Sequence, residues 1–338
     1  MMLPVIGILL GDAAGIGPEI VSRLFETDEL LRYCRPILIG DRRILEWGMK
    51  ISGTTFPLQE IETPSQAQWP GAVPFIDRKN LDPSQITLGQ ISAISGRVTG
   101  EMLVYALQLC TKGQLAGFAF APYNKAAMEY GGYPLLEKGK SIFARHLNWD
   151  KPFDELNVIG DLWTARVTSH IPLKQVSEHL SLKRIKRVIG LTFETLKRAG
   201  FENPRLAVAA LNPHGGEDGL CGREEIEIIG PAVEAARAEG LPVSGPFPAD
   251  TLFVMAMKGR FDGIITLYHD QGQIALKMMH FGKVVTVLGG LPYAITTPAH
   301  GTAFDIAGKG VADPEGMKQA VIIASRMARW RKDPGEGT

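Results

Sequence analysis

The alternation of short apolar runs with longer amphipathic runs is the feature of this sequence that most restricts its fold. Most of the short runs carry too few polar residues for a strand with one face in water, which favours a parallel sheet covered on both faces. The runs expected to form strands are residues 4–10, 36–39, 117–121, 156–159, 164–167, 205–210, 263–267 and 284–288. The predicted fold class is therefore α/β, with mostly parallel sheets between helices.

The longer runs repeat their apolar residues at the spacing of an α-helix. In the run that begins at Leu182, the apolar residues Ile185, Val188 and Ile189 share one face, and Gly200 follows as a helix stop. Helices are expected at residues 19–25, 89–110, 182–199, 224–239 and 314–330. The stretch 53–84, rich in Pro, Gln and Thr, is expected to be irregular surface.

The length of the chain predicts two domains. At roughly 100–200 residues per domain, 338 residues are more consistent with two units than with one. We expect residues 1–123 together with 289–338 to form the first α/β domain, and residues 124–288 to form the second. The two ends of the chain would then pair in one domain.

Charge balance and hydropathy exclude two classes of partner. The 36 basic residues equal the 36 acidic ones, so no basic stripe for nucleic acid is indicated. The apolar N-terminal run lacks a basic segment, and Asp12 interrupts it long before the roughly 20 apolar residues that span a bilayer. The three cysteines are scattered without a CxxC pair, which fits a reducing compartment. We therefore expect a soluble, cytoplasmic protein that binds neither nucleic acid nor membrane.

Three of the seven histidines share one context. His170, His214 and His269 each come just after one of the expected strands. Ligands of open α/β sheets collect at the carboxyl ends of strands, and three neutral imidazoles gathered there would make an open divalent-metal site. Taken singly, each is more often a capping or hydrogen-bonding histidine. Asp270 and Lys277 lie around the last of them, where a desolvated lysine can act as a general acid or base; the alternative is an exposed helical lysine.

Two glycine-rich segments are candidates for a cofactor site. The turn at residues 11–19 follows the first strand but lacks the GxGxxG order of the dinucleotide fingerprint, so it either approaches a ligand closely or is a tight turn without one. In the loop 299–314, small residues would let an adenine lie beside His300. Asp305 there can accept both ribose hydroxyls, which favours NAD over NADP. The alternative is a glycine-rich connection between the domains.

The segment before Ser141 ends like a phosphate-binding P-loop. The first glycine of that motif would fall at Pro134, so this loop cannot wrap its amides around a phosphate. Lys140 and Ser141 could still hold an anion as a point charge and a hydroxyl donor. A solvated lysine beside a helix-capping serine is the alternative.

Six strings together resemble the 4-hydroxythreonine-4-phosphate dehydrogenase family. They occur in the order of the family and cover nearly the whole chain, and no single one would suffice. The strings are GDAAGIGPE (11–19), SHIPL (169–173), NPHGGE (212–217), PADT (248–251), YHDQG (268–272) and HGTA (300–303). The first and last also resemble the related isocitrate and isopropylmalate dehydrogenases.

This resemblance implies the isocitrate and isopropylmalate dehydrogenase fold, with two-domain α/β/α subunits in a homodimer and the active site in the interdomain cleft. It implies one divalent metal per site, held by His170, His214 and His269 and shared between the subunits. Histidine ligands favour zinc, with magnesium, manganese or cobalt as alternatives. The residues implied to bind NAD are Gly11, Asp12, His300, Gly301, Thr302 and Asp305.

The resemblance also implies a reaction. It is the NAD-dependent oxidation of a secondary alcohol in a hydroxy acid, followed by decarboxylation of the resulting β-keto acid. Lys277 matches a substrate-contacting lysine of the family and, like a water ordered by Asp270, is a candidate base. Asp250 is a candidate for orienting a ligand histidine.

The chain departs from the family in its substrate contacts. Lys140, followed by Ser141, stands where the family has a histidine, Thr286 where it has an asparagine, and Ile295 where it has an arginine. Isoleucine cannot replace the bidentate anion contact of a guanidinium. We therefore predict a small-molecule substrate different from the vitamin B6 precursor, either a four-carbon sugar-acid phosphate or an aromatic-acid dihydrodiol.

Two other classes of function stay open at this point. One is a metal-dependent hydrolase or phosphatase that uses the same three histidines without NAD. The other is a non-catalytic small-molecule binding protein, which the retained histidines and Lys277 disfavour.

Overall fold

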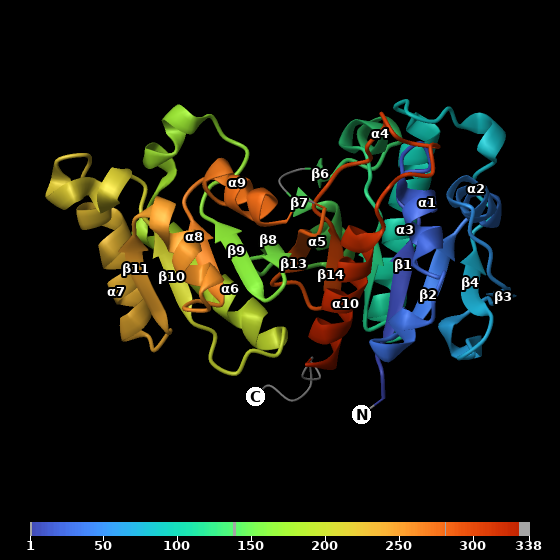
Figure 1. Ribbon diagram of the computed structural model, residues 1–338, viewed down its shortest axis with the longest axis horizontal. Helices are drawn as coiled ribbons and strands as arrows, with labels where there is room; N and C mark the ends of the chain where they lie inside the picture. The colour runs from blue at the N-terminus through green and yellow to red at the C-terminus, as the bar shows by residue number, and fades with distance from the viewer. Residues whose placement is uncertain (1, 138–139, 281, 331–338) are drawn as a thin grey trace. The chain divides into compact units, whose positions relative to one another are not determined.

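The structure is a computed structural model that describes residues 2–137, 140–280 and 282–330. The chain divides into two compact units, one made of Met1–Lys151 and Leu291–Thr338 and the other of Pro152–Gly290 (Figure 1). Parallel strand pairs predominate in both units, so the predicted α/β class is confirmed.

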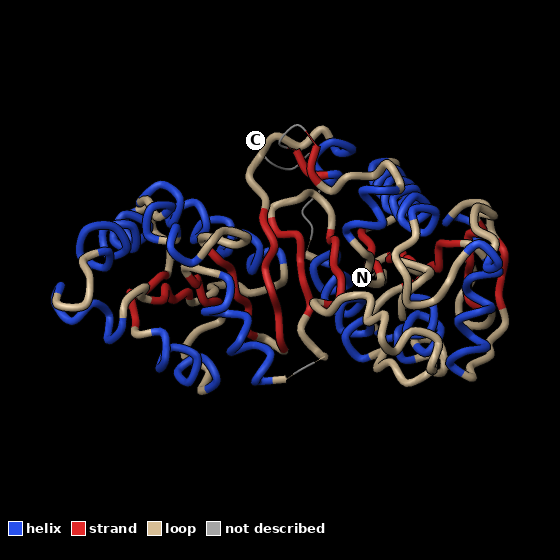
Figure 2. Tube along the Cα trace, turned by 90° about the horizontal axis from the view of Figure 1, so that it is seen from above, coloured by secondary structure: helices blue, strands red, loops and turns tan. Residues whose placement is uncertain are grey.

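In the first unit, neighbouring strands all pair in parallel. Their spatial order is β14 (Ala294–Pro298), β5 (Gly117–Phe120), β1 (Val5–Leu9), β2 (Arg35–Gly40), β4 (Val73–Asp77) and β3 (Leu58–Glu60). Ile6 of β1 lies opposite Pro36 on one side and Gly117 on the other. Helices lie on both sides of these strands (Figure 2), which explains why β1 and β5 in the middle of the sheet are apolar.

Most helices of the first unit begin at a polar side chain that accepts an amide hydrogen of the first turn. Asp41, Ser92, Asn124 and Ser141 serve in this way, satisfying N–H groups that have no partner within the helix. The helices are α1 (Gly17–Arg23), α2 (Arg42–Ser52), α3 (Ala93–Thr111), α4 (Lys125–Tyr130), α5 (Ile142–Leu147) and α10 (Glu315–Arg329).

The stretch 53–84 is more regular than predicted. It holds β3 and β4, and β4 adds to the sheet beside β2, with Leu38 opposite Phe75. Phe75 is fully buried. The prediction of an irregular surface was wrong for these two strands because β4 includes Pro74, which is tolerated here because only the three-residue strand β3 lies beyond β4.

Residues 124–151, expected in the second domain, belong to the first unit. The reason is the close contact between α3 and α4. A Cβ atom on Gly96 of α3 would lie 1.8 Å from the carbonyl oxygen of Ala127, so the two backbones touch where Gly96 has no side chain. The chain therefore leaves the first unit only after α5, at Pro152.

The sheet of the second unit is mixed. Its strands, in spatial order, are β11 (Val243–Phe247), β10 (Leu206–Ala209), β12 (Gly263–Thr266), β9 (Leu162–Arg166), β8 (Asp154–Ile159) and β13 (Val285–Gly289). The first four are parallel to one another, whereas β8 runs antiparallel to both β9 and β13. β8 and β9 form a hairpin in which Ile159 pairs with Leu162.

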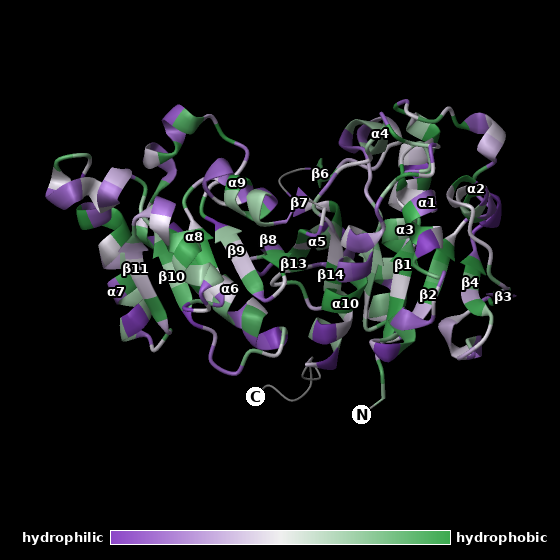
Figure 3. Ribbon diagram, viewed as in Figure 1, coloured by the Kyte–Doolittle hydropathy of each residue, from purple (hydrophilic) through white to green (hydrophobic). Residues whose placement is uncertain are grey.

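The helices of the second unit pack an apolar core against this sheet. They are α6 (Leu182–Arg198), α7 (Gly230–Ala238), α8 (Ala249–Met257) and α9 (His269–Met279). Leu252 and Phe253 of α8 pack with Ala207 and Ala209 of β10, and α8 stands out as apolar in Figure 3. The α6 face predicted from Ile185, Val188 and Ile189 is buried.

All eight predicted strands are present, with ends that differ by no more than two residues. The predicted helix 224–239 is divided into a π-helical turn, Glu225–Ile229, and α7. Within the described residues, no helix combines the length and apolar character that crossing a membrane requires. The charged run 329–338, which the sequence predicts to fray, lies outside the described residues from position 331 onwards.

Candidate active site

The three candidate metal ligands follow three neighbouring strands. β10, β12 and β9 are adjacent and parallel, and their chain continuations carry His214, His269 and His170 respectively. Because carboxyl ends of adjacent parallel strands meet at one edge of a sheet, the histidines start from neighbouring positions. α9 begins at His269 and lies at this edge (Figure 1).

Two of the three imidazoles are close together. The ring centres of His170 and His269 lie 6.0 Å apart, with a 40° angle between the ring planes. The Nδ1 atom of His269 lies 2.7 Å from Oδ1 of Asp270, so a proton on Nδ1 is held by the carboxylate and the lone pair falls on Nε2. Among the described residues, no three His, Cys, Asp or Glu side chains are gathered closely enough to hold a metal ion.

His214 lies in a turn with unusual backbone geometry. The turn Pro213–Gly219 places six consecutive residues, 214–219, at positive φ, including His214 (φ 53°), Glu217 (φ 48°) and Asp218 (φ 54°). A non-glycine residue in the left-handed region costs about 1–3 kcal/mol, and it persists only where the surroundings enforce it. This turn therefore needs strong anchors.

Glu225 is one such anchor. Its Oε1 accepts the backbone N–H groups of Leu211 (2.7 Å) and Asn212 (2.9 Å), and its Oε2 accepts the Asn212 side-chain amide (2.9 Å). Burial alone would raise the pKa of the Glu225 carboxyl, but the hydrogen bonds from Asn212 and Leu211 bring it below the ordinary value. The carboxylate that holds the chain leading to His214 is therefore ionised at neutral pH.

Gln271 ties two of the histidine-bearing segments together. Its Oε1 accepts the N–H of Leu267 after β12, and its Nε2 donates to the carbonyl of Ala210 after β10, both at 2.7 Å. The start of α9 is thus joined by one side chain to the segment that leads to His214. Gln271 belongs to the YHDQG string (268–272), but nothing in the sequence alone predicts this bridging role.

Three further predicted residues lie in the second unit. Lys277 and Asp250 are exposed, in the last turn of α9 and the first turn of α8. Pro248, before α8, approaches the position of a Cβ on Gly215, so the predicted site of Asp250 lies near the His214 turn. Thr286 accepts a hydrogen bond from the Asn157 side chain (3.0 Å).

In the first unit, Asp12 stabilises the turn in which it lies. Its side chain is 1% exposed, and its Oδ1 accepts the Ser95 hydroxyl (2.5 Å) and the N–H of Ala14 (2.9 Å). Its Oδ2 has no hydrogen-bond partner among the described residues. Burial raises the pKa of the Asp12 carboxyl above its ordinary value, although the Ser95 and Ala14 hydrogen bonds oppose this.

The two glycine-rich segments of the first unit lie against each other. The N–H of Ile16 donates to the carbonyl of Thr302 (3.1 Å), and a Cβ on Gly15 would lie 2.8 Å from the Thr302 Cβ. Thr302 is therefore buried, while Asp305 is exposed. The segments predicted to take up a cofactor, including Gly11 and Gly301, thus form one assembly within this unit.

Lys140 and Ser141 both have partners within the first unit. Ser141 caps α5 by accepting the N–H of Ala144 (3.1 Å). Lys140 pairs at the surface with Asp150. Residues 138 and 139 of the P-loop-like string lie outside the described residues.

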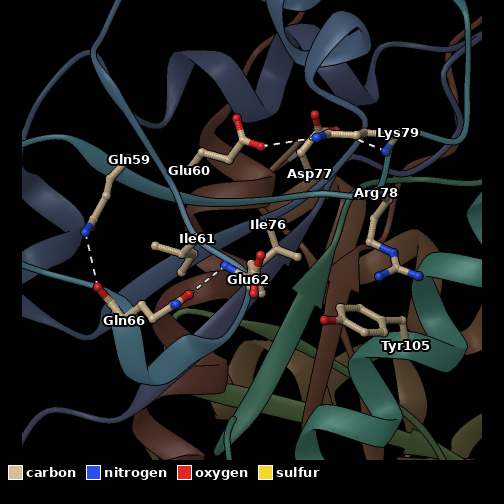
Figure 4. Close-up of a pocket in the computed structure, with 10 residues that line it drawn as sticks. All are labelled: Gln59, Glu60, Ile61, Glu62, Gln66, Ile76, Asp77, Arg78, Lys79 and Tyr105. Carbon is tan, nitrogen blue, oxygen red and sulfur yellow. Dashed lines mark hydrogen bonds and ion pairs between the residues drawn. The ribbon is translucent and has the colours of Figure 1, made fainter.

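A cavity of about 720 Å³ lies elsewhere in the first unit, beside β3 and β4 (Figure 4). Its polar lining groups pair with one another. Lys79 lies 3.5 Å from Glu60, and the Arg78 guanidinium stacks on the Tyr105 ring at 3.9 Å. None of the predicted site residues lines it, and its lining has no obvious need of a ligand.

Comparison with known proteins connects this arrangement to a family. The sequence profile described as "Pyridoxal phosphate biosynthetic protein PdxA" matches residues 32–324, which is most of the chain. The chain belongs to the PdxA family. The match confirms the resemblance inferred from the six strings.

Individual members of the PdxA family match over nearly their whole length. A 4-hydroxythreonine-4-phosphate dehydrogenase of Desulforapulum autotrophicum is 39% identical, covering 96% of each chain. A D-threonate 4-phosphate dehydrogenase of Cupriavidus necator is also 39% identical, covering 96% of this chain and 99% of the other. The crystal structure of a 4-hydroxythreonine-4-phosphate dehydrogenase from Klebsiella pneumoniae superposes with a TM-score of 0.85 at 35% identity, covering 97% and 98%.

Proposed function

We propose that this chain is a dehydrogenase that depends on NAD and a divalent metal, oxidises a secondary alcohol of a hydroxy acid, and decarboxylates the product. The observation that carries the proposal is the strand order in the second unit, where His170, His214 and His269 follow three adjacent parallel strands. The family relatives that carry the name dehydrogenase support the oxidation step.

The donor set suits a divalent transition metal. Two imidazoles bound to one zinc ion through bonds of about 2.1 Å have ring centres roughly 5–6 Å apart, and the His170–His269 separation of 6.0 Å is at that limit. His214 would supply the third imidazole. Such an ion, zinc or alternatively cobalt, manganese or magnesium, supplies Lewis acidity toward the alcohol and the later carbonyl.

The chain's own residues have separate tasks in this proposal. Asp270 holds the proton on Nδ1 of His269, so that Nε2 is the coordinating atom. Lys277 is exposed on α9 and accepts the proton of the alcohol only as a neutral amine, which requires that the bound substrate desolvate it; a water ordered by Asp270 is the alternative base. Asp250 orients the imidazole of His214, and Thr286 contacts the substrate.

NAD is proposed to lie on the assembled glycine-rich segments of the first unit. Thr302 and Gly15 hold the two segments together, and the exposed Asp305 is available to the ribose hydroxyls. His300, Gly301 and the backbone of residues 11–12 complete the set.

The substrate proposed is a four-carbon sugar-acid phosphate. A relative that covers nearly all of this chain is named for D-threonate 4-phosphate. Ile295, where the family pattern has an arginine, is fully buried in β14, so a phosphate must be met by other cations. Lys140 and Lys277 are exposed cations, and the hydroxyl of Ser141 lies beside the first.

A panel of hydroxy acids tests this proposal. We expect NADH absorbance to rise with D-threonate 4-phosphate when NAD and Zn²⁺ or Mn²⁺ are present. Unphosphorylated threonate, 4-hydroxythreonine 4-phosphate and an aromatic-acid cis-dihydrodiol should react more slowly. Release of inorganic phosphate without NADH would instead support the metal-dependent phosphatase, and saturable binding of NAD in a calorimeter separates the two directly.

The homodimer belongs to the same proposal. α9 carries two large apolar side chains in water, Ile274 (62% exposed) and Met278 (82% exposed), on the helix that starts at His269. A symmetric partner that covers this helix would bring the two subunits to one metal site. Sedimentation equilibrium should give twice the mass of the chain; a monomer at micromolar concentration would contradict the shared site.

A further inference from the structure

Arg166 is a buried cation close to the histidine pair. It ends β9 and is 8% exposed, and it is the single cation among the buried charged side chains of the described residues. Its Nε donates to the Ser169 hydroxyl (2.6 Å), one terminal nitrogen to Oδ1 of Asn157 (2.6 Å) and the other to Oε2 of Glu155 (2.9 Å). The guanidinium fork thus holds three side chains at once.

Asn157 passes this connection on to a helix. Its Oδ1 also accepts the Gln273 side-chain amide of α9 (2.5 Å), while its own amide donates to Thr286 of β13. Both ends of the Asn157 amide are therefore occupied, which fixes its orientation. One hydrogen-bonded network, buried at Arg166 and Asn157, joins β8, β9, α9 and β13.

The two ends of this network lie next to the two close imidazoles. Ser169 directly precedes His170, and Gln273 lies one helical turn after His269 in α9. In the path Ser169–Arg166–Asn157–Gln273, the two hydrogen bonds to Oδ1 of Asn157 are buried and the Arg166–Ser169 bond is partly buried. Hydrogen bonds in such surroundings are strong, and their loss is costly.

We propose that Arg166 is a positioning residue that sets the spacing between His170 and His269, and thereby the affinity of the site for a divalent metal. This inference rests on the proposed function, since it assumes that the two histidines bind one ion. Arg166 does not coordinate anything itself; it acts through Ser169 and, by way of Asn157, through α9.

Charge and geometry predict opposite effects at this position. A buried positive charge near a cation site opposes metal binding, so removing it would tighten binding if charge alone mattered. Loss of the fork releases Ser169 and Asn157, which should weaken binding. Arg166→Lys keeps the charge but cannot donate to three acceptors in fixed directions. Arg166→Met removes both charge and fork.

The experiment is a titration of the metal-free full chain with Zn²⁺ against a chromophoric chelator. Groups that orient metal ligands typically contribute 10–100-fold to affinity, and we expect losses of about that size in both Arg166→Lys and Arg166→Met. Ser169→Ala, which leaves Arg166 in place, should show a smaller loss. The d–d spectrum of bound Co²⁺ should change in the same order.

Arg205→Lys is the matched control. Arg205 makes a two-pronged pair with Asp262 (3.0 and 2.8 Å) in the same unit, just before β10 and β12, at the opposite ends of the strands from the histidines. The Arg205→Lys variant should bind Zn²⁺ with the affinity of the unmodified chain. An equal loss in this control would overturn the proposal, because the effect would then be general destabilisation.

The outcomes distinguish failure of the Arg166 proposal from failure of the proposed metal site. Unchanged or tighter Zn²⁺ binding in Arg166→Lys and Ser169→Ala would overturn the role of Arg166 and leave the proposed function standing. Failure of the unmodified chain to bind Zn²⁺, Co²⁺ or Mn²⁺ would overturn the proposed metal site, and this inference with it.

Discussion

The two units hold their candidate site segments together by opposite means. In the first unit, backbones touch: Gly15 lies against Thr302, and the N–H of Ile16 donates to the Thr302 carbonyl. In the second unit, long polar side chains reach between segments, as Gln271 does from α9 to the end of β10. In the first unit the segments are positioned by a close backbone approach at a glycine. In the second unit they are positioned by side-chain hydrogen bonds.

This difference predicts that substitutions in the two units affect different properties, stability in the first and activity in the second. A side chain added at a backbone contact must displace backbone, so changes in the first unit should cost stability before they change chemistry. In the second unit the histidine-bearing turns are held from their flanks. Changes to the histidines themselves should cost activity while leaving the fold in place.

The largest expected effect is at His214. His214→Ala should reduce turnover by more than about 100-fold, beyond the usual effect of losing a group that only orients a ligand. His214→Gly should lose activity equally but gain stability, by about 1 kcal/mol, because glycine adopts the observed φ of 53° without strain. Initial rates and thermal unfolding measure both. Undiminished turnover in either variant would exclude His214 as a metal ligand.

A smaller effect is expected for an added methyl group in the first unit. Gly15→Ala should lower the free energy of unfolding by about 1–3 kcal/mol and weaken NAD binding, because the new Cβ meets Thr302. Gly190→Ala is the control: it lies in α6 with open space around it and should stabilise by up to about 1 kcal/mol. Urea unfolding and NAD titration report the two quantities. If Gly15→Ala were as stable as the parent chain, the contact with Thr302 would not be tight.

The smallest effects concern pH. The pKa of Glu225 is lowered in the folded chain, so its contribution to stability is present above its unfolded pKa and is lost as pH falls through the folded value. The pKa of Asp12 is raised, so its contribution is present at low pH and is lost as pH rises.

Two isosteric variants check these signs. Relative to the unmodified chain, Glu225→Gln should become less stable as the pH rises from about 3 to 6, whereas Asp12→Asn should become more stable. Parallel pH profiles for the two variants would contradict the contrast between the raised pKa of Asp12 in the first unit and the lowered pKa of Glu225 in the second.

The sequence predicted which segments form strands better than it predicted which strands are adjacent in the sheet. The strands before His170, His214 and His269 were all predicted, because buried parallel strands are apolar runs. Their adjacency could not be predicted, because the chain order β9, β10, β12 becomes β10, β12, β9 in the sheet through crossovers. β4 was missed because it contains Pro74 and ends in the charged Asp77.

The polar supports of the site were also missed, for a physical reason. Arg166 reaches Asn157 of the neighbouring strand, and Gln273 lies 116 residues away from Asn157 along the chain, so only the folded structure pairs them. The one signal in the sequence is Arg166 itself, a charged residue inside the predicted strand 164–167. A charged side chain in a buried strand requires hydrogen-bonding partners, so the sequence predicts that Arg166 has partners but not which residues they are.

The most direct measurement is anomalous X-ray scattering at the zinc or cobalt edge from crystals grown with that metal. The account predicts one peak per chain, bound by nitrogen atoms of His170, His214 and His269, after any symmetric partner is included. A peak held by other side chains, or three imidazoles that stay apart in the metal-loaded crystal, would contradict it.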